Sequence, residues 1–279
     1  MIAWPDGKKV AVSFAFDVDL ELNWSESNRL DPDHLVHMSK GTYGAKQGIP
    51  RILRMLDIQG IKATFFVPAY NATIYPQLIR EIHNRGHEIA NHNVHHFDEL
   101  TTTPEAVLEE AEKILWDICQ VKPRGFRPTT NFRPKEDQFS EELGKILLDR
   151  GYYYISWRED CDGPKILEID GKILPVVDLM ASGFYDDTEY DYYIDSPPAR
   201  YGIKSAAQQI EIWRDEFDGM AEEEGKLMNF IIHPQFFGRA CRVNALGELI
   251  AYMKSRGAWI ATNEEIARHL LQTNGFQIP

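Results

Sequence analysis

Residues 75–96 read YPQLIREIHNRGHEIANHNVHH, and this stretch holds one complete unit of the fold that we expect. The pattern over 75–85 predicts a helix, the glycine that follows ends it, and the apolar run Glu88–Ala90 predicts a short buried strand. Two histidines, His92 and His96, follow that strand four residues apart. Neutral imidazole is the commonest protein ligand for zinc-like metals, so this stretch indicates a metal site at the end of a strand.

The same alternation of helix and strand continues on both sides of this unit. It predicts a mostly parallel sheet, and seven or eight strands in a chain of this length favour an α/β fold of the irregular, TIM-like (β/α) barrel type with about seven parallel strands. The expected strands cover 10–16, 63–67, 88–90, 125–127, 152–156, 173–177, 227–232 and 258–261, and the expected helices cover 45–59, 75–85, 104–120, 141–150, 205–224, 246–256 and a last one opened by a capping box at 262–265.

Composition limits the classes of protein that fit. The chain has 279 residues, of which 43% are apolar, so a single domain over 1–279 is expected. The formal net charge of -13 argues against a nucleic-acid partner. The three cysteines, Cys119, Cys161 and Cys241, form no close pair, which favours a reducing compartment. With no visible secretory signal and no apolar run of membrane-spanning length, a cytoplasmic protein is expected.

Other reactive side chains also follow predicted strands. Asp17 and Asp19 come at the end of the first strand, Arg127 ends another, and His233 follows the apolar run 227–232. Taken singly, each has an ordinary explanation as a turn residue, a surface charge or a packed histidine. The carboxyl ends of barrel strands form one face, which carries the active site in this class of fold, so their convergence predicts a metal-dependent hydrolytic site.

On these residues the chain resembles the polysaccharide deacetylase family, the NodB-homology domain of carbohydrate esterase family 4. Within that family, the chain resembles the subgroup of peptidoglycan-deacetylase-like and allantoinase- or cyclic-imidase-like proteins. The segments that carry this resemblance are Tyr43–Ala45, Gly60–Pro68 and His233–Gln235. The third motif, Arg127–Phe132, and Asn93 after His92 depart from the common family forms. The matched motifs, in family order, are Ser13–Asp19, His92–His96, Phe126–Pro128, Ser156–Asp160 and Phe230–His233.

The resemblance implies a role for each matched residue. Asp19, His92 and His96 would hold one divalent metal, zinc by default, with cobalt, manganese, nickel or iron as alternatives; His95 is a second choice of ligand by spacing alone. The metal would activate water and polarise the scissile carbonyl. Asp17 would be the general base oriented by Arg127, and His233 would be the acid that protonates the leaving nitrogen, tuned by Asp162 or Asp187. The substrate would contact Tyr43, Asn131 and Trp157.

The expected function is hydrolysis of a non-peptide C–N bond. A deacetylase of N-acetylated amino sugars or glycans leads, and a cytosolic hydrolase of cyclic amides, imides or ureides is the alternative on the same site. The aromatic loop Asp178–Gly202 is expected to wall the substrate space, and self-association is a further expectation. The β-α alternation argues against an iron(II) oxygenase, which uses the same ligand set. The presence of both Asp17 and His233 argues against a non-catalytic glycan-binding relative.

Overall fold

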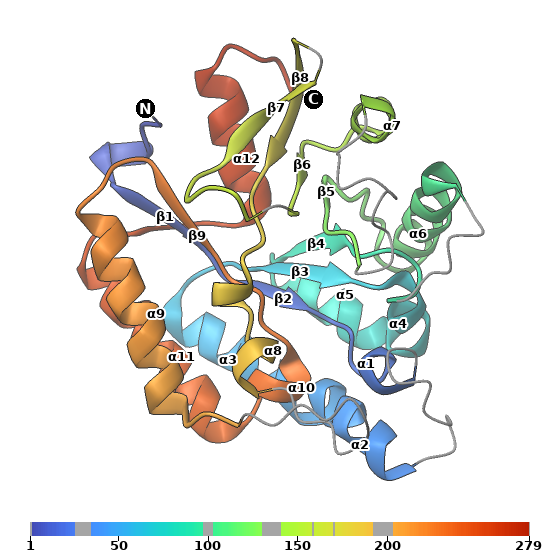
Figure 1. Cartoon of the computed structure of the whole chain (residues 1–279). Helices are drawn as coiled ribbons and strands as arrows, with labels where there is room; N and C mark the ends of the chain where they lie inside the picture. The colour runs from blue at the N-terminus through green and yellow to red at the C-terminus, as the bar shows by residue number, and fades with distance from the viewer. Residues whose placement is uncertain are drawn as a thin grey trace.

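The computed structural model describes residues 2–25, 35–96, 103–129, 141–157, 159–169, 171–191 and 203–278 (Figure 1). The strands are β1 Val10–Ser13, β2 Ala15–Asp17, β3 Thr64–Val67, β4 Glu88–Asn91, β5 Gly125–Phe126, β6 Tyr154–Ile155, β7 Lys165–Ile169, β8 Lys172–Asp178, β9 Lys226–Asn229 and β10 Trp259–Ile260. The helices are η1 Pro5–Gly7, α1 Leu22–Ser25, α2 Leu35–Tyr43, η2 Gly44–Gly48, α3 Ile49–Gln59, α4 Ala69–Ile74, α5 Pro76–Asn84, α6 Pro104–Cys119, α7 Glu141–Arg150, η3 Gly183–Tyr185, α8 Thr188–Asp191, α9 Ala206–Ala221, α10 Pro234–Phe237, α11 Ala240–Ser255 and α12 Asn263–Thr273.

The strands form an α/β fold with a mostly parallel sheet, as the sequence predicts. Seven strands run in the order β2-β3-β4-β5-β6-β8-β7, in which only β7 is antiparallel to its neighbour, and three more run in the order β10-β1-β9. Isolated bridges join Phe16 of β2 to Ile232, and Ile231 to Asp186, which follows β8. The strands thus approach a closed circuit, which is consistent with the predicted barrel.

Buried aromatic and aliphatic side chains fill the space inside this circuit. Every residue of β1, β2 and β3 is buried, as a parallel sheet covered on both faces requires. Phe14, at the break between β1 and β2, stacks on Phe230 with ring centroids 4.8 Å apart. Helix α11 packs against both α3 and α9 on one side of the molecule (Figure 1). A rigid core therefore supports the ends of the strands.

Most predicted helices are confirmed, with their ends set by the expected caps. Thr103 caps α6 through its side chain, Gly60 ends α3 with φ 62°, and the capping box of Thr262 and Glu265 opens α12. None of the helices in the described part of the chain combines the length and apolar content needed to cross a bilayer.

Four details differ from the prediction. The single strand expected over 10–16 is two strands, α11 begins at Ala240 rather than 246, and neither α4 nor β7 was predicted. Strands β7 and β8 form a hairpin, for which the Asp170-Gly171 dipeptide is a sequence signal. The two long interruptions contain short helices: α1 and α2 in the first, η3 and α8 in the second.

Candidate functional site

The two aspartates lie where β2 ends and the chain turns away from the sheet. Asp17 is the last residue of β2 and Asp19 follows it; both side chains are buried. The backbone here is fixed, because the Asp17 N–H donates to Ile232 O at 2.9 Å and Asn71 Nδ2 donates to the carbonyl oxygens of Val18 and Asp19, each at 2.7 Å. The carboxylates are therefore held at a defined edge of the sheet.

The two histidines are carried by a tight turn after β4. Asn93, between them, has φ 64°, a left-handed conformation that asparagine tolerates better than most residues. Its backbone N–H donates to Asn91 Oδ1 at 2.9 Å, and its Nδ2 donates to Thr129 Oγ1 at 2.7 Å. The departure from the family form at this position thus has a local structural reason.

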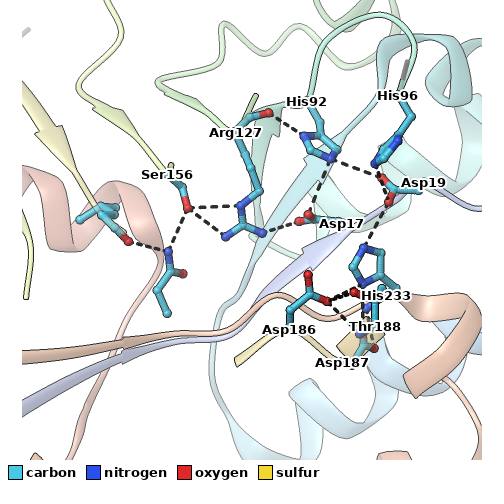
Figure 2. Close-up of polar contacts among 12 residues, drawn as sticks. Asp17, Asp19, His92, His96, Arg127, Ser156, Asp186, Asp187, Thr188 and His233 are labelled. Carbon is cyan, nitrogen blue, oxygen red and sulfur yellow. Dashed lines mark hydrogen bonds and ion pairs between the residues drawn. The ribbon is translucent and has the colours of Figure 1, made fainter. Parts of the chain in front are cut away.

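The rings of His92 and His96 both face the carboxylate of Asp19 (Figure 2). His92 Nε2 lies 3.5 Å from Asp19 Oδ1, and His96 Nε2 lies 3.3 Å from Asp19 Oδ2. Among the described residues these three side chains form a group whose ligand atoms all lie within 4.8 Å of one another. Two donor atoms bound tetrahedrally at about 2.1 Å to one metal are about 3.4 Å apart, so the spacing fits a zinc-like ion.

The tautomer of His92 strengthens this interpretation. His92 Nδ1 lies 2.6 Å from the carbonyl oxygen of Arg127, which can only accept, so Nδ1 carries the proton. Burial lowers the pKa of His92, although Asp17 and Asp19 oppose that shift, and the ring is neutral. The lone pair of Nε2 then faces Asp19 Oδ1, and neither of these buried atoms has a hydrogen-bond partner in the described chain. Two opposed acceptors at this distance are stabilised by a cation between them.

Arg127 connects the aspartates to the neighbouring strands. Its Nη1 donates to Asp17 Oδ1 at 2.5 Å, and its Nε and Nη2 donate to Ser156 Oγ at 3.2 and 3.1 Å. The guanidinium also lies 4.0 Å from the ring centroid of Phe66. Asp17 Oδ2 is left to face His92 Nε2 at 3.6 Å. This buried ion pair holds Asp17 with one oxygen turned toward the His92 ring.

His233 approaches the same carboxylate from the end of the segment after β9. Its Nε2 lies 3.2 Å from Asp19 Oδ2, while its Nδ1 lies 2.6 Å from Asp187 Oδ1. The His233 backbone N–H donates to Asp187 Oδ2 at 2.8 Å. Asp186, Asp187 and His233 form a second compact group of potential ligand atoms, but 2.6 Å is a hydrogen-bond distance and marks a histidine–carboxylate dyad.

The charges in this cluster support one another. Burial alone would raise the pKa of Asp19, but attraction to His96 and hydrogen bonds from His233 and His96 hold it well below its ordinary value. Burial alone would lower the pKa of His233, but Asp187 and Asp19 keep it well above its ordinary value. The structure thus brings together all six residues predicted from the sequence as catalytic or metal-binding: Asp17, Asp19, His92, His96, Arg127 and His233.

Other predicted residues have different surroundings. His95 packs on the ring of Tyr70, with centroids 4.7 Å apart, and is not in the Asp19 group. Tyr43 accepts a hydrogen bond from Arg51 and lies under the guanidinium of Arg239. Trp157 packs against the smaller core cluster, which includes Ile155 of β6 and Val176 of β8, and Asn131 lies outside the described residues.

The choice between Asp162 and Asp187 is also resolved by distance. Asp162 Oδ2 pairs with Lys226 Nζ at 3.2 Å, whereas Asp187 contacts His233. Sequence reasoning missed Asn229, which donates to Ser156 Oγ at 3.2 Å and to the carbonyls of Leu179 and Met180. A buried asparagine inside the apolar run 227–232 was the available signal.

Comparison with known proteins shows similarity to the polysaccharide deacetylase family. A family profile described as polysaccharide deacetylase matches residues 41–155. The peptidoglycan deacetylase of Helicobacter pylori is 24% identical over 96% of this chain and 98% of its own length.

Two solved structures share the fold over nearly the whole chain. A protein from Mycobacterium smegmatis, assigned to the polysaccharide deacetylases, is 31% identical, with a TM-score of 0.87 over 99% of this chain and 95% of the other. The PuuE allantoinase is 22% identical, with a TM-score of 0.80 over 98% and 94%, a likeness that shows the fold alone.

Proposed function

The chain belongs to the polysaccharide deacetylase family, and on that premise we propose that it is a metal-dependent hydrolase that deacetylates N-acetylated amino sugars or glycans. The similarity to deacetylases supports a hydrolase of the polysaccharide deacetylase type. Metal dependence and the substrate class are the parts that we add. The side chains around Asp19 support metal dependence, and the similarity to peptidoglycan deacetylase supports the substrate class.

A single observation carries the metal proposal. His92 Nε2 and Asp19 Oδ1 are buried, face each other at 3.5 Å and have no hydrogen-bond partner in the described chain. Asp19, His92 and His96 would hold the ion, with zinc as the default for a mixed nitrogen and oxygen ligand set. When bound, the ion supplies Lewis-acid activation of water and of the substrate carbonyl.

The protein side chains divide the proton transfers between them. Asp17, fixed by Arg127 and with Oδ2 directed at the His92 ring, takes a proton from the attacking water. His233, held by Asp187, gives a proton to the departing amide nitrogen, which is a poor leaving group until it is protonated. Asp17 faces the His92 ring and His233 contacts the Asp19 carboxylate, so the proposed base and acid reach the same cluster through different groups (Figure 2).

A cyclic amide, imide or ureide is the second candidate substrate. The observation that favours it is the match of this fold to that of allantoinase over nearly the whole chain. That match supports a common scaffold, and the same metal, base and acid would serve ring opening. A substrate panel separates the two candidates.

The test loads the purified protein with zinc and measures two products. We expect acetate release from N-acetylated chito-oligosaccharides or peptidoglycan fragments, and loss of a dihydrouracil- or succinimide-type ring would instead select the second candidate. Asp17→Asn should lower turnover by at least about 100-fold, because the base is lost, while the metal content stays unchanged. Absence of turnover on every amide with metal bound would exclude both substrates and favour a non-catalytic relative.

We also propose that the protein works in the cytoplasm. The support is that Cys119, Cys161 and Cys241 are all free, as in a reducing compartment. Fractionation of cells that express the native gene tests this, and recovery in the extracellular fraction would contradict it.

A further inference from the structure

A hollow of about 410 Å³ lies at the amino ends of β3, β4 and β5. His87 and Arg124 directly precede the parallel strands β4 and β5, whereas His92 and Arg127 directly follow them. The hollow is therefore on the opposite edge of the sheet from the Asp19 cluster, which we define as Asp17, Asp19, His92, His96, Arg127 and His233. Its volume falls in the range of small-molecule sites, about 300–1,000 Å³. Four cationic side chains line it: Lys62, Lys122, Arg124 and Arg268.

Two of these cations are held in place by one aromatic ring. The guanidinium groups of Arg124 and Arg268 lie 5.1 and 4.9 Å from the ring centroid of Tyr153. Arg124 Nη1 also donates to Gly151 O at 3.0 Å, and Arg268 Nη2 donates to Tyr153 OH at 3.2 Å. Side chains ordered in this way lose little conformational entropy when they bind a ligand.

A third cation joins them without a counter-ion. Lys122 is exposed and has no hydrogen bond or ion pair to any described residue. A Cβ added to Gly151 would lie 3.0 Å from Arg124 Nη1 and 3.8 Å from Lys122 Nζ, so both charges converge on that glycine. Like charges brought together in this way repel unless an anion neutralises them.

The three acidic residues of the hollow have partners other than Lys62, Lys122 and Arg124. Glu88 accepts hydrogen bonds from Tyr154 OH at 2.6 Å, from Thr64 Oγ1 at 2.7 Å and from the Glu264 backbone N–H at 3.0 Å. Glu265 accepts from the Thr262 backbone N–H at 2.8 Å, and Glu264 pairs with Arg268. None of these contacts neutralises Lys122 or Lys62.

His87 adds a buried hydrogen-bond donor to the four cationic side chains that line the hollow. His87 accepts from the Ala63 backbone N–H through Nδ1 at 3.3 Å, so its proton is on Nε2, and that buried nitrogen has no partner in the described chain. Lys62 Nζ donates to the Arg85 carbonyl oxygen at 2.5 Å, which is a neutral partner. The hollow thus places the cations of Lys62, Lys122 and Arg124 together, without an acidic partner among the described residues, in a chain whose formal net charge is -13.

We propose that this hollow binds a small oxyanion of the phosphate class, either free phosphate or the phosphate of a monoester. The guanidinium fork of Arg124 suits bidentate contact with phosphate oxygens, and Lys122 adds a point charge. The proposal is independent of the catalytic function, because none of these residues contacts the Asp19 cluster in the described structure.

Isothermal titration of the full-length, metal-loaded protein with inorganic phosphate, at ionic strength held constant with sodium chloride, tests the site. Lys122→Glu should weaken binding about tenfold, because one contact to a charged group is replaced by repulsion. The matched control is Lys113→Glu, at an exposed position on α6 outside the hollow, and it should change affinity by less than about twofold because distant surface charges are screened.

A sugar phosphate as second ligand separates the two sources of the anion. Tighter binding than inorganic phosphate, also lost in Lys122→Glu, identifies a monoester; equal binding identifies the free ion. The proposal is overturned if phosphate produces no binding heat, or if Lys122→Glu and Lys113→Glu weaken binding equally. Phosphate captured by the metal would be insensitive to both variants, which also contradicts the proposal.

Discussion

Asp187 fixes the His233 side chain through both of its carboxylate oxygens. One oxygen accepts from the His233 backbone and the other lies 2.6 Å from the ring Nδ1, so Nε2 is directed at Asp19. Asp186 is the neighbouring carboxylate, but it lies 3.8 Å from the same Nδ1. The two adjacent aspartates therefore differ in the role we assign them, although both are acidic residues in one turn.

We expect Asp187→Asn to lower kcat about 10- to 100-fold, in the range for residues that orient a functional group. The asparagine side chain can donate a hydrogen bond as well as accept one, so it no longer favours the His233 tautomer that carries its proton on Nδ1. Asp186→Asn should retain most of the activity. Steady-state kinetics with metal analysis measures the activity of both variants, and equal activity of the two would contradict the positioning role of Asp187.

Glu88 is a second residue whose environment changes its titration. Burial raises its pKa from 4.5 to about 7, despite the hydrogen bonds from Tyr154 and Thr64 that favour the ionised form. A raised pKa means that the folded state binds the proton of this carboxyl group more tightly than the unfolded state does. The resulting contribution to stability is complete below the ordinary pKa and is lost as the pH rises toward 7.

The free energy of unfolding of the native protein should therefore fall more steeply between about pH 4.5 and pH 7 than that of Glu88→Gln, which cannot ionise. Urea denaturation across this range, in buffers without phosphate, measures the difference. Glu168→Gln, at an exposed position on β7, is the control and should follow the native slope. Parallel curves for the native protein and Glu88→Gln would contradict the assignment.

Among the helices and strands, the continuous helix formed by α2 and η2 packs through three glycines against the segments that follow Asp19 and His233. Gly41 packs on the backbone of Glu21, and Gly44 packs between Leu20 and Gln235. Gly48 packs on the Pro234 carbonyl, next to His233. The segment after Asp19 and the segment after His233 are thus set at a fixed spacing by backbone contact. The π-helical turn Gly44–Gly48 fits the tendency of such turns to occur at functional sites.

Gly48→Ala should destabilise the protein by about 1–3 kcal/mol and lower activity, because the new methyl group overlaps the Pro234 carbonyl oxygen and the backbone must shift. Gly219→Ala in α9 meets nothing within 4 Å and should be neutral or up to about 1 kcal/mol more stable. Urea denaturation and kcat for both variants provide the check. A Gly48→Ala protein with native stability and activity would show that the close contact is unimportant.

The sequence predicts elements well where local signals are strong. Thr103-Pro104, Gly60 and the Thr262 capping box identify helix ends because their chemistry is local. The break at Phe14 was not predictable, since it arises from the pairing of β1 with β9 and of β2 with β3, which are distant in the sequence. Hairpin β7–β8 was missed because only parallel strands were expected.

At the scale of the whole molecule, the parallel order of strands assembles the site. Asp17, His92 and Arg127 follow or end β2, β4 and β5, and His233 is brought beside β2 by the pairing of Phe16 with Ile232 (Figure 1). The motif order in the sequence therefore suffices to predict these residues. It does not predict the supporting contacts, because Ser156 and Asn229 meet only after β6 and β9 are placed.

The proposed function depends on one cation held by Asp19, His92 and His96. Anomalous diffraction from crystals of the zinc-loaded protein, measured at the zinc absorption edge, tests it most directly. We predict one peak per chain, about 2.0–2.3 Å from an Asp19 oxygen and from Nε2 of both histidines. A map with no peak at this position, or with its peak at other residues, would contradict the account.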